Sequence, residues 1–223
     1  MSPGEWEDAS ALSGFWYDYN KSDFRFLAPP QTQLQVYSAY DKQYLYFVFS
    51  SPIYPENSWL KARGRFPDVL SHPLYGILWD DHIELEIRPH DDLAEAFLLG
   101  LLRFDVNPIN SYCDWYWSQG TGQDMTWTSD AKIRSTANGN RWVIEFAIPH
   151  KSMRYGNYAD NDEQDRPHVQ IPPPDGTVYR TWFVRGIGGN GKFFNAFDNH
   201  SWNTTKTKLI FDSDAPSFQI NEL

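Results

Sequence analysis

Cysteines, basic residues and long apolar runs are all scarce in this sequence. Its 223 residues contain one cysteine, Cys113, which rules out a disulfide within the chain and a cysteine-based zinc site and suits a small buried apolar side chain. Lys and Arg number 19 against 29 Asp and Glu, giving a formal net charge of −10. Such a charge disfavours nucleic acids, anionic membranes and strongly acidic polysaccharides as partners. The composition therefore favours a neutral ligand.

No segment has the features of a membrane span or a secretion signal. The apolar run 96–102 is much shorter than the about 20 residues that a transmembrane helix needs. The first six residues form neither a basic nor an apolar signal region. With 41% hydrophobic and 22% charged residues, we expect one folded domain over 1–223. We expect it to be extracellular or periplasmic, as a mature or excised domain, and a cytoplasmic location stays open.

Alternation of apolar and polar residues with period two dominates the chain. Residues 82–88, His-Ile-Glu-Leu-Glu-Ile-Arg, separate into one apolar and one charged face, as a half-buried strand requires. Asn138-Gly139 is a strong hairpin signal. A single helical turn is expected at 150–155, where Met153 would pack under the turn. Strands are predicted at 33–39, 44–50, 82–88, 97–106, 130–136, 141–148, 177–185, 208–211 and 217–220. The pattern predicts an all-β fold, an antiparallel β-sandwich of jelly-roll-like type with long aromatic-rich loops.

Aromatic residues are unusually abundant, with ten Trp, thirteen Tyr and fifteen Phe. Many fall in segments that we interpret as turn-rich, namely Trp59, Trp79, the run 112–117 and Trp202. The long segments 51–78 and 156–176 give no strand signal, and loops of this length are often functional. A flat ring at a loop tip suits a flat, uncharged ligand such as a sugar, whereas the alternative is that each ring belongs to the core.

Six stretches follow one another in a recognisable order. They are Gly-Glu-Trp-Glu-Asp-Ala at 4–9, the hairpin 35–47, Trp-Asp-Asp-His-Ile-Glu-Leu at 79–85, Phe-Asp-Val-Asn-Pro-Ile-Asn at 104–110 followed by Asp114, Trp-Val-Ile-Glu-Phe-Ala-Ile-Pro at 142–149, and Asn-His-Ser-Trp at 199–202. Together they resemble carbohydrate-binding module family 9 and its wider relatives, the DOMON-like β-sandwiches. The resemblance covers nearly the whole chain.

The resemblance implies an aromatic clamp, in which two rings hold a terminal sugar while polar side chains bind its hydroxyls. Trp202 matches the late ring, and Trp79 lies one position from the spacing of the early ring. Asn199, Glu84 and Asn107 match hydroxyl-binding residues. In place of a basic residue of the family this chain has Asp105, which puts recognition of a reducing end in doubt.

Residue parity points to the same polar patch without the resemblance. Glu84 lies on the polar side of its strand, and Arg103, Asp105 and Asn107 share one face of the next. If these strands pair, their polar sides form one patch, which Arg185 from a later strand could join. The alternative is an ordinary solvated sheet face with cross-strand charge pairs.

Metal and cofactor signals are weaker. Asp160, Asp162 and Asp165 offer oxygen ligands at the short spacing of a calcium loop, without the glycine and closing glutamate of an EF-hand. A solvated acidic loop is the alternative. The six histidines match no zinc or iron motif. We therefore expect that no cofactor is required, with structural calcium as the one candidate.

The leading hypothesis is a non-catalytic carbohydrate-binding module that belongs to, or partners, a polysaccharide-degrading protein, either in the same chain or in another. A second hypothesis is a glycoside-active enzyme on the same sandwich, with a carboxylate pair drawn from Asp80, Asp81, Glu84 and Asp105. A third is a haem-binding DOMON-like electron-transfer domain, with Met125, Met153 or a histidine as axial ligand. Nucleic-acid binding and membrane insertion are not expected.

Overall fold

The structure is a computed structural model of the chain. It describes residues 9–11, 16–18, 34–53, 62, 64, 76–91, 100–156, 169–187, 193–197, 207–214 and 219–221. Within these residues, no helix has the length and apolar character needed to cross a membrane.

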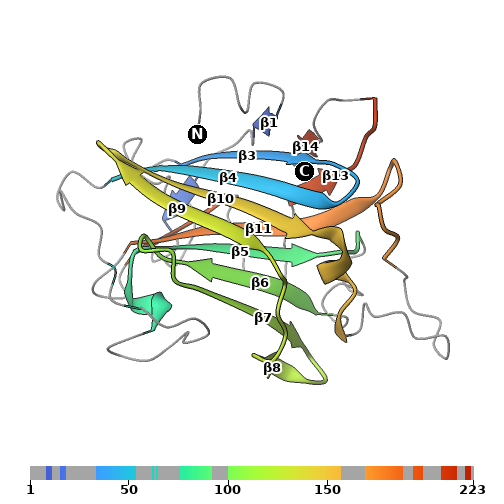
Figure 1. Ribbon diagram of the computed structural model, residues 1–223, viewed down its shortest axis with the longest axis horizontal. Helices are drawn as coiled ribbons and strands as arrows, with labels where there is room; N and C mark the ends of the chain where they lie inside the picture. The colour runs from blue at the N-terminus through green and yellow to red at the C-terminus, as the bar shows by residue number, and fades with distance from the viewer. Residues whose placement is uncertain are drawn as a thin grey trace.

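Two antiparallel sheets face each other, which confirms the predicted β-sandwich (Figure 1). Sheet A has the strand order β1 (Ser10–Ala11), β3 (Gln35–Tyr40), β4 (Tyr44–Pro52), β10 (Arg141–Pro149), β9 (Lys132–Asn138). Sheet B has the order β14 (Gln219–Asn221), β13 (Thr207–Ile210), β11 (Val178–Ile187), β5 (His82–Arg88), β6 (Leu101–Val106), β7 (Tyr112–Ser118), β8 (Gly122–Asp124). Beside this path, β12 (Phe193–Phe197) pairs with β11 and with β2 (Trp16–Asp18).

The apolar halves of the strands meet between the two sheets. In β5 the residues at odd positions, such as Leu85, are buried in this core, as the alternation predicted. Aromatic rings from the two sheets pack on one another. The ring centroids of Phe47 and Phe183 lie 5.9 Å apart and those of Phe104 and Phe146 lie 6.1 Å apart, both pairs in edge-to-face geometry. Such pairs add to the burial energy of the rings themselves.

Two tight hairpins set the register of sheet A. Asp41 accepts hydrogen bonds from the backbone N–H groups of Gln43 and Tyr44, both at 2.7 Å, and so closes the β3–β4 turn. The β9–β10 turn is shifted by one residue from the prediction, because Asn138 stays paired with Arg141 and the loop is formed by residues 139–140. Gly139 opens it at φ +60°, a conformation that favours glycine.

One element differs in kind from the prediction. The aromatic run 112–117, interpreted from the sequence as turn-rich, is strand β7, and it pairs with β6 along its whole length. Trp115 and Tyr116 are buried, on opposite faces of the sheet, because successive side chains of a strand alternate. The Cys113 side chain is buried in the same apolar cluster as Trp115, as its expected role as a small apolar residue requires.

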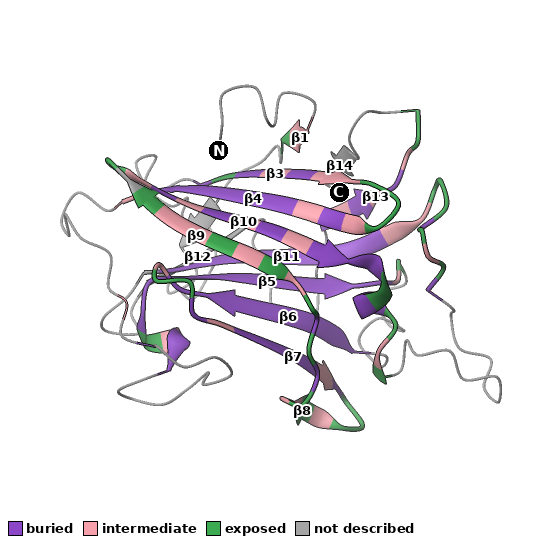
Figure 2. Cartoon of the chain, in the orientation of Figure 1, coloured by how far each residue is buried: buried purple, intermediate pink, exposed green. Residues whose placement is uncertain are grey.

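Two short 3-10 turns lie at opposite ends of the sandwich (Figure 1). The turn η2 (Ile77–Trp79) precedes β5, and η3 (His150–Met153) follows β10 as the predicted single turn. Met153 is fully buried under it. Every residue of β5 and β6 is buried, so both faces of these central strands are covered (Figure 2).

Candidate functional site

The polar residues of β5 and β6 lie on the face of sheet B that points away from sheet A, here called the outer face. In the register of these strands Glu84 lies opposite Asp105, and Glu86 lies opposite Arg103. The predicted polar patch therefore exists, but it is not a solvated sheet face, because all of its members are buried. The outer-face residues are His82, Glu84, Glu86, Arg88, Arg103 and Asp105.

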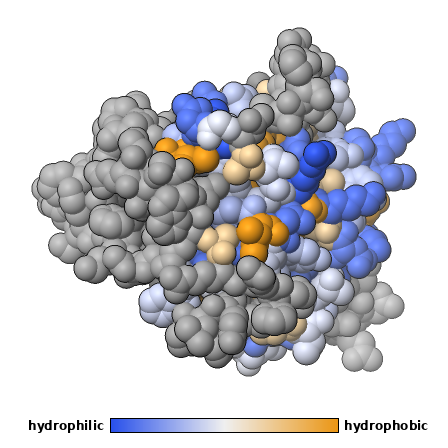
Figure 3. Space-filling view, turned by 60° about the vertical axis from the view of Figure 1, so that its left-hand side comes forward, coloured by the Kyte–Doolittle hydropathy of each residue, from blue (hydrophilic) through white to orange (hydrophobic). Residues whose placement is uncertain are grey.

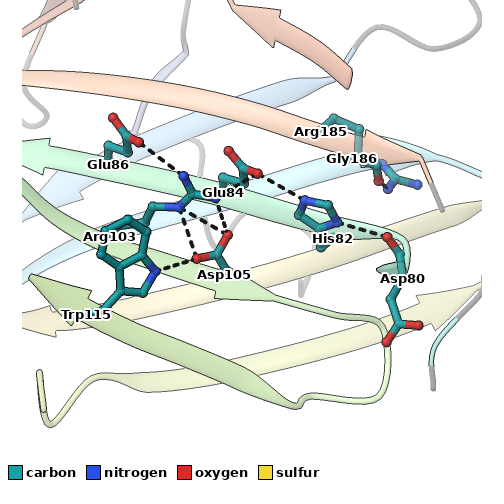
Figure 4. A network of polar contacts seen from close by, with 9 residues as sticks. All are labelled: Asp80, His82, Glu84, Glu86, Arg103, Asp105, Trp115, Arg185 and Gly186. Atoms are coloured by element: carbon teal, nitrogen blue, oxygen red, sulfur yellow. Dashed lines mark hydrogen bonds and ion pairs between the residues drawn. The ribbon is translucent and has the colours of Figure 1, made fainter. Parts of the chain in front are cut away.

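Arg103 is the centre of the outer face (Figure 4). Its Nη2 lies 2.8 Å from both Glu84 Oε1 and Asp105 Oδ1, and its Nη1 lies 3.4 Å from Glu86 Oε1. The guanidinium lies over the Trp115 ring, 5.0 Å from the ring centroid, and the Trp115 indole N–H donates to Asp105 Oδ2 at 2.9 Å. One cation thus joins three carboxylates on a rigid aromatic support.

His82 extends this network toward η2. Its Nδ1 lies 2.9 Å from the Asp80 carbonyl oxygen and its Nε2 lies 3.1 Å from Glu84 Oε1. Both partners are acceptors, so a ring that carries two protons satisfies both contacts. Gly186 of β11 lies opposite His82, and a Cβ there would come within 2.0 Å of the imidazole. The glycine is therefore needed for the ring to fit.

Burial and charge act against each other in the pKa values of this network. Burial raises the pKa of Glu86 to about 7, with Arg103 and Arg88 opposing the shift and the other two carboxylates adding to it. Burial also raises the pKa of Asp105, against the charge of Arg103. For Glu84 burial is outweighed by Arg103 and His82, and its pKa is lowered. The His82 pKa is raised, because Glu84 and Asp105 outweigh the effect of its burial.

These shifts divide the network into two pairs. The lowered pKa of Glu84 and the raised pKa of His82 favour their charged forms, whereas the raised pKa values of Asp105 and Glu86 favour their neutral forms, and Glu86 titrates near neutrality. Ligand atoms of His82, Glu84 and Asp105 lie within 4.8 Å of one another, a spacing that could hold a metal ion. However, Arg103 contacts both carboxylates and already supplies the positive charge that such an ion would bring.

A second polar arrangement fixes the loops at the η2 end of the sheet. Asp80 Oδ2 accepts hydrogen bonds from the Gly64 N–H at 2.7 Å and from Asn107 Nδ2 at 3.0 Å. Asn107 Nδ2 also donates to the Gly64 carbonyl at 2.7 Å, and its Oδ1 accepts from the N–H groups of Ile109 and Ser111. We call Asp80 and Asn107 the loop clamp, because their side chains join three separate chain segments.

Two exposed apolar side chains flank this clamp. Among the described residues, Trp79 and Ile109 are the two large hydrophobic residues that are exposed, at 44% and 49%. Trp79 lies next to Asp80, and Ile109 lies two residues after Asn107, so both belong to the same end of the sheet. In the view toward this end, apolar patches stand separately among hydrophilic atoms (Figure 3).

Arg185 does not join the outer face, contrary to the prediction. It lies opposite Ile83, so it faces sheet A, where its guanidinium lies 4.6 Å from the centroid of the Trp142 ring. Its Nε donates to Ser51 Oγ at 3.1 Å, and its Nη2 lies 2.8 Å from Asp81 Oδ1. Figure 4 shows it apart from the Arg103 network. Arg185 therefore bridges the two sheets.

Several predicted residues lie outside the described part of the chain, and their roles stay predictions. They are Trp59, Asn199, Trp202, Asp160, Asp162 and Asp165. Conversely, sequence reasoning did not assign His82, Trp115 and Asp80 to the polar network. Trp115 shares its parity with Cys113 and Trp117, so pairing of β7 with β6 would have placed it beside Arg103.

Comparison with known proteins shows the fold. No family model and no curated protein matches the sequence. Among solved structures, a candidate carbohydrate-binding protein from Bacteroides uniformis has a TM-score of 0.57 at 11% identity, over 87% of this chain and 83% of its own. A family 9 carbohydrate-binding module from Caldicellulosiruptor kristjanssonii, solved with cellotriose, has a TM-score of 0.50 at 14% identity, over 88% of this chain and 76% of its own. The chain has the β-sandwich fold of these two proteins.

Proposed function

We propose that this chain is a non-catalytic carbohydrate-binding module that holds a neutral sugar or glycan end at the η2 end of sheet B. The observation that carries the proposal is Trp79, a large ring that is 44% exposed on a turn held by the loop clamp. The fold shared with a module that was solved with cellotriose supports it.

The geometry of the Trp79 turn suits stacking on a sugar. The C–H face of a pyranose ring is apolar and flat, so it packs on an indole face while its hydroxyls stay hydrated or hydrogen-bonded. Asp80 follows Trp79 directly, and its buried carboxylate is anchored by Asn107 and the Gly64 N–H. A turn that is already ordered loses little conformational entropy when a ligand binds.

The buried polar residues support this end from behind. Glu84, Asp105 and Asn107 are at most 6% exposed, so in this conformation they act through the residues that they hold. Asn107 is then a positioning residue for the Trp79 turn. The second ring of the clamp is proposed at Trp202 and a hydroxyl-binding amide at Asn199. A neutral ligand is favoured because the chain carries a net charge of −10.

The proposed function also indicates a partner protein, a location and cofactor needs. A small sugar-binding module is useful when it keeps a catalytic domain near its polysaccharide, so we propose a polysaccharide-degrading parent or partner outside the cytoplasm. Stacking and hydroxyl hydrogen bonds require no cofactor. Structural calcium near Asp160, Asp162 and Asp165 stays a proposal that titrations with and without calcium would test.

The experiment is a glycan-array screen followed by calorimetric titration of the sugar that binds, with and without calcium. Exposed sites of this kind correspond to a Kd of about 1 μM to 1 mM, or roughly −8 to −4 kcal/mol. Trp79→Ala is expected to weaken binding at least about tenfold, and Trp202→Ala likewise, since each loses one stacking face.

The matched control is Ile109→Ala, which removes the other exposed apolar side chain at the same end. It is expected to leave the affinity within about twofold and, like Trp79→Ala, to change stability by less than about 0.5 kcal/mol. An unchanged affinity in Trp79→Ala, or no binding across the array, would contradict the proposed site.

A further inference from the structure

A separate small cavity opens at the η3 end of the sandwich, away from Trp79. Its volume is about 250 Å³, and it lies between the segment before β9 and the turn η3. Pockets for drug-sized ligands hold about 300–1,000 Å³, so this cavity suits a single ring rather than a chain of sugars. Its lining includes Trp127, Thr128, Asp130, Lys151, Arg154 and Tyr155.

Two aromatic rings form a rigid wall of the cavity. The rings of Trp127 and Tyr155 lie 5.9 Å apart at 45°, and Trp127 packs edge-to-face on Phe104 of the core at 5.6 Å. Tyr155 packs on Tyr116 at 5.5 Å, and its hydroxyl donates to Asp124 Oδ2 at 2.8 Å. Both rings are therefore held in place before any ligand arrives.

Gly156 makes this arrangement possible. It adopts φ +56°, and a Cβ at this position would come within 2.4 Å of the Tyr116 ring. The chain can therefore pass close to Tyr116 only with glycine here, and this close approach fixes the neighbouring Tyr155.

The rim of the cavity carries two cations and one anion. Lys151 Nζ lies 2.8 Å from Asp130 Oδ2, and both side chains are more than half exposed. An exposed ion pair of this kind is weak and exchanges partners readily. Arg154 is held at its Nε, which donates to the Val169 carbonyl at 2.7 Å. The charged lining residues thus have a net charge of +1 in a chain whose net charge is −10.

We propose that this cavity is a second ligand site, which takes a single sugar ring that bears a carboxylate, such as a hexuronate. The sugar ring lies against the partly exposed Tyr155 ring, which the buried Trp127 ring supports, and its carboxylate is bound by Lys151 and Arg154 at the rim. The Thr128 hydroxyl and Asp130 provide partners for sugar hydroxyls. Lys151 exchanges Asp130 for the ligand carboxylate, which is an exchange of one exposed ion pair for another. This site is independent of the Trp79 site.

The overall negative charge limits the ligand to a small anion. A long acidic polysaccharide would meet repulsion over the whole surface, whereas one carboxylate meets mainly the two cations at the rim, since exposed charges are screened beyond about 10 Å at 0.1 M salt. The affinity should consequently fall as salt is raised.

The test is calorimetric titration of the full chain with D-glucuronate, with D-glucose as the uncharged counterpart. Saturable binding of glucuronate with a Kd of about 10 mM or tighter is expected. Lys151→Gln should weaken it about five- to tenfold, whereas Asp130→Asn, which frees Lys151, should strengthen it about two- to threefold. Asn tolerates the left-handed backbone of Asp130, φ +53°, as well as Asp does.

Two controls separate this site from the Trp79 site and from general charge effects. Lys42→Gln removes the same charge from an exposed hairpin and should leave glucuronate affinity unchanged. Trp79→Ala should also leave it unchanged. No saturable glucuronate binding, equal affinity for glucose, or equal effects of Lys151→Gln and Lys42→Gln would each overturn the proposal.

Discussion

The two faces of β5 and β6 are equally buried but differ in chemistry. The inner face presents side chains such as Leu85 and Phe104 to sheet A, and the outer face presents Glu84, Arg103 and Asp105. Apolar burial stabilises the inner face roughly in proportion to area, at about 25 cal/mol per Å². The charged side chains of the outer face gain nothing from area in this way, because desolvating their charges opposes folding.

The charged side chains of the outer face are therefore compatible with a stable fold only when all of their partners are present. Arg103 contacts three carboxylates, and Trp115 covers the guanidinium while its N–H completes the bonding of Asp105. A missing methyl group on the inner face leaves a small cavity, but a missing partner on the outer face leaves an uncompensated charge. The two faces consequently predict different responses to mutation.

The largest effect is expected for Arg103→Met. It leaves the buried Glu84 and Asp105 without their cation and should lower the free energy of unfolding by about 3–5 kcal/mol. Urea unfolding at pH 7 measures this. The exposed Arg134→Met on β9 serves as the control and should change it by less than about 0.5 kcal/mol.

Combining Arg103→Met with Glu84→Gln and Asp105→Asn sharpens this test. Because the triple variant removes the cation together with the two carboxylates that lie 2.8 Å from it, it should recover more than half of the lost stability. A triple variant as unstable as the sum of its single changes would mean that the charges do not act as one set.

The next effect is a pH dependence that comes from Glu86. Burial raises its folded pKa to about 7, above its ordinary value of 4.5. Its contribution to stability is thus full below pH 4.5 and is lost as pH rises through 7, by about 2–3 kcal/mol between pH 5 and 8. Urea unfolding at pH 5 and at pH 8 measures this loss of stability, and Glu86→Gln should abolish it. Glu145→Gln, on the partly exposed side of β10, should keep the wild-type pH profile.

A smaller effect is expected at the loop clamp. Asn107→Ala deprives the N–H groups of Ile109 and Ser111 of their side-chain acceptor and Asp80 of one donor, which should cost about 2 kcal/mol. Sugar affinity should fall severalfold, because the Trp79 turn is less well fixed. Asn140→Ala, in the exposed β9–β10 loop, should change neither quantity. If Asn107→Ala kept the wild-type sugar affinity, the loop clamp would not contribute to sugar binding at Trp79.

The sequence predicts the fold well because periodicity is a local signal. Strand 82–88 was predicted with its observed bounds, since the clean alternation of Ile and Leu with charged residues marks both faces. The run 112–117 was missed as a strand because aromatic side chains of β7 itself point to both faces, so no alternation of polarity is visible in the sequence. Arg185 was placed on the wrong face because both faces of β11 are buried there as well.

The network itself depends on register, which the sequence does not display. That Arg103 contacts Glu84 and Asp105 follows from the pairing of β5 with β6, and its stacking on Trp115 follows from the pairing of β6 with β7. The burial of these charges depends on what covers the outer face. Parity alone therefore predicted Glu84, Arg103 and Asp105 as members of the patch, but it did not predict that these residues form a buried support.

The most direct test of the account compares two indole N–H signals in NMR spectra during a titration with the sugar found on the array. Trp79 reports on the exposed end, and Trp115 reports on the buried outer face; Trp79→Phe and Trp115→Phe assign their signals. The account predicts a saturable shift of the Trp79 signal, with the Trp115 signal nearly unchanged. A shift of Trp115 without a shift of Trp79 would contradict it, since the sugar would then enter the charged network itself.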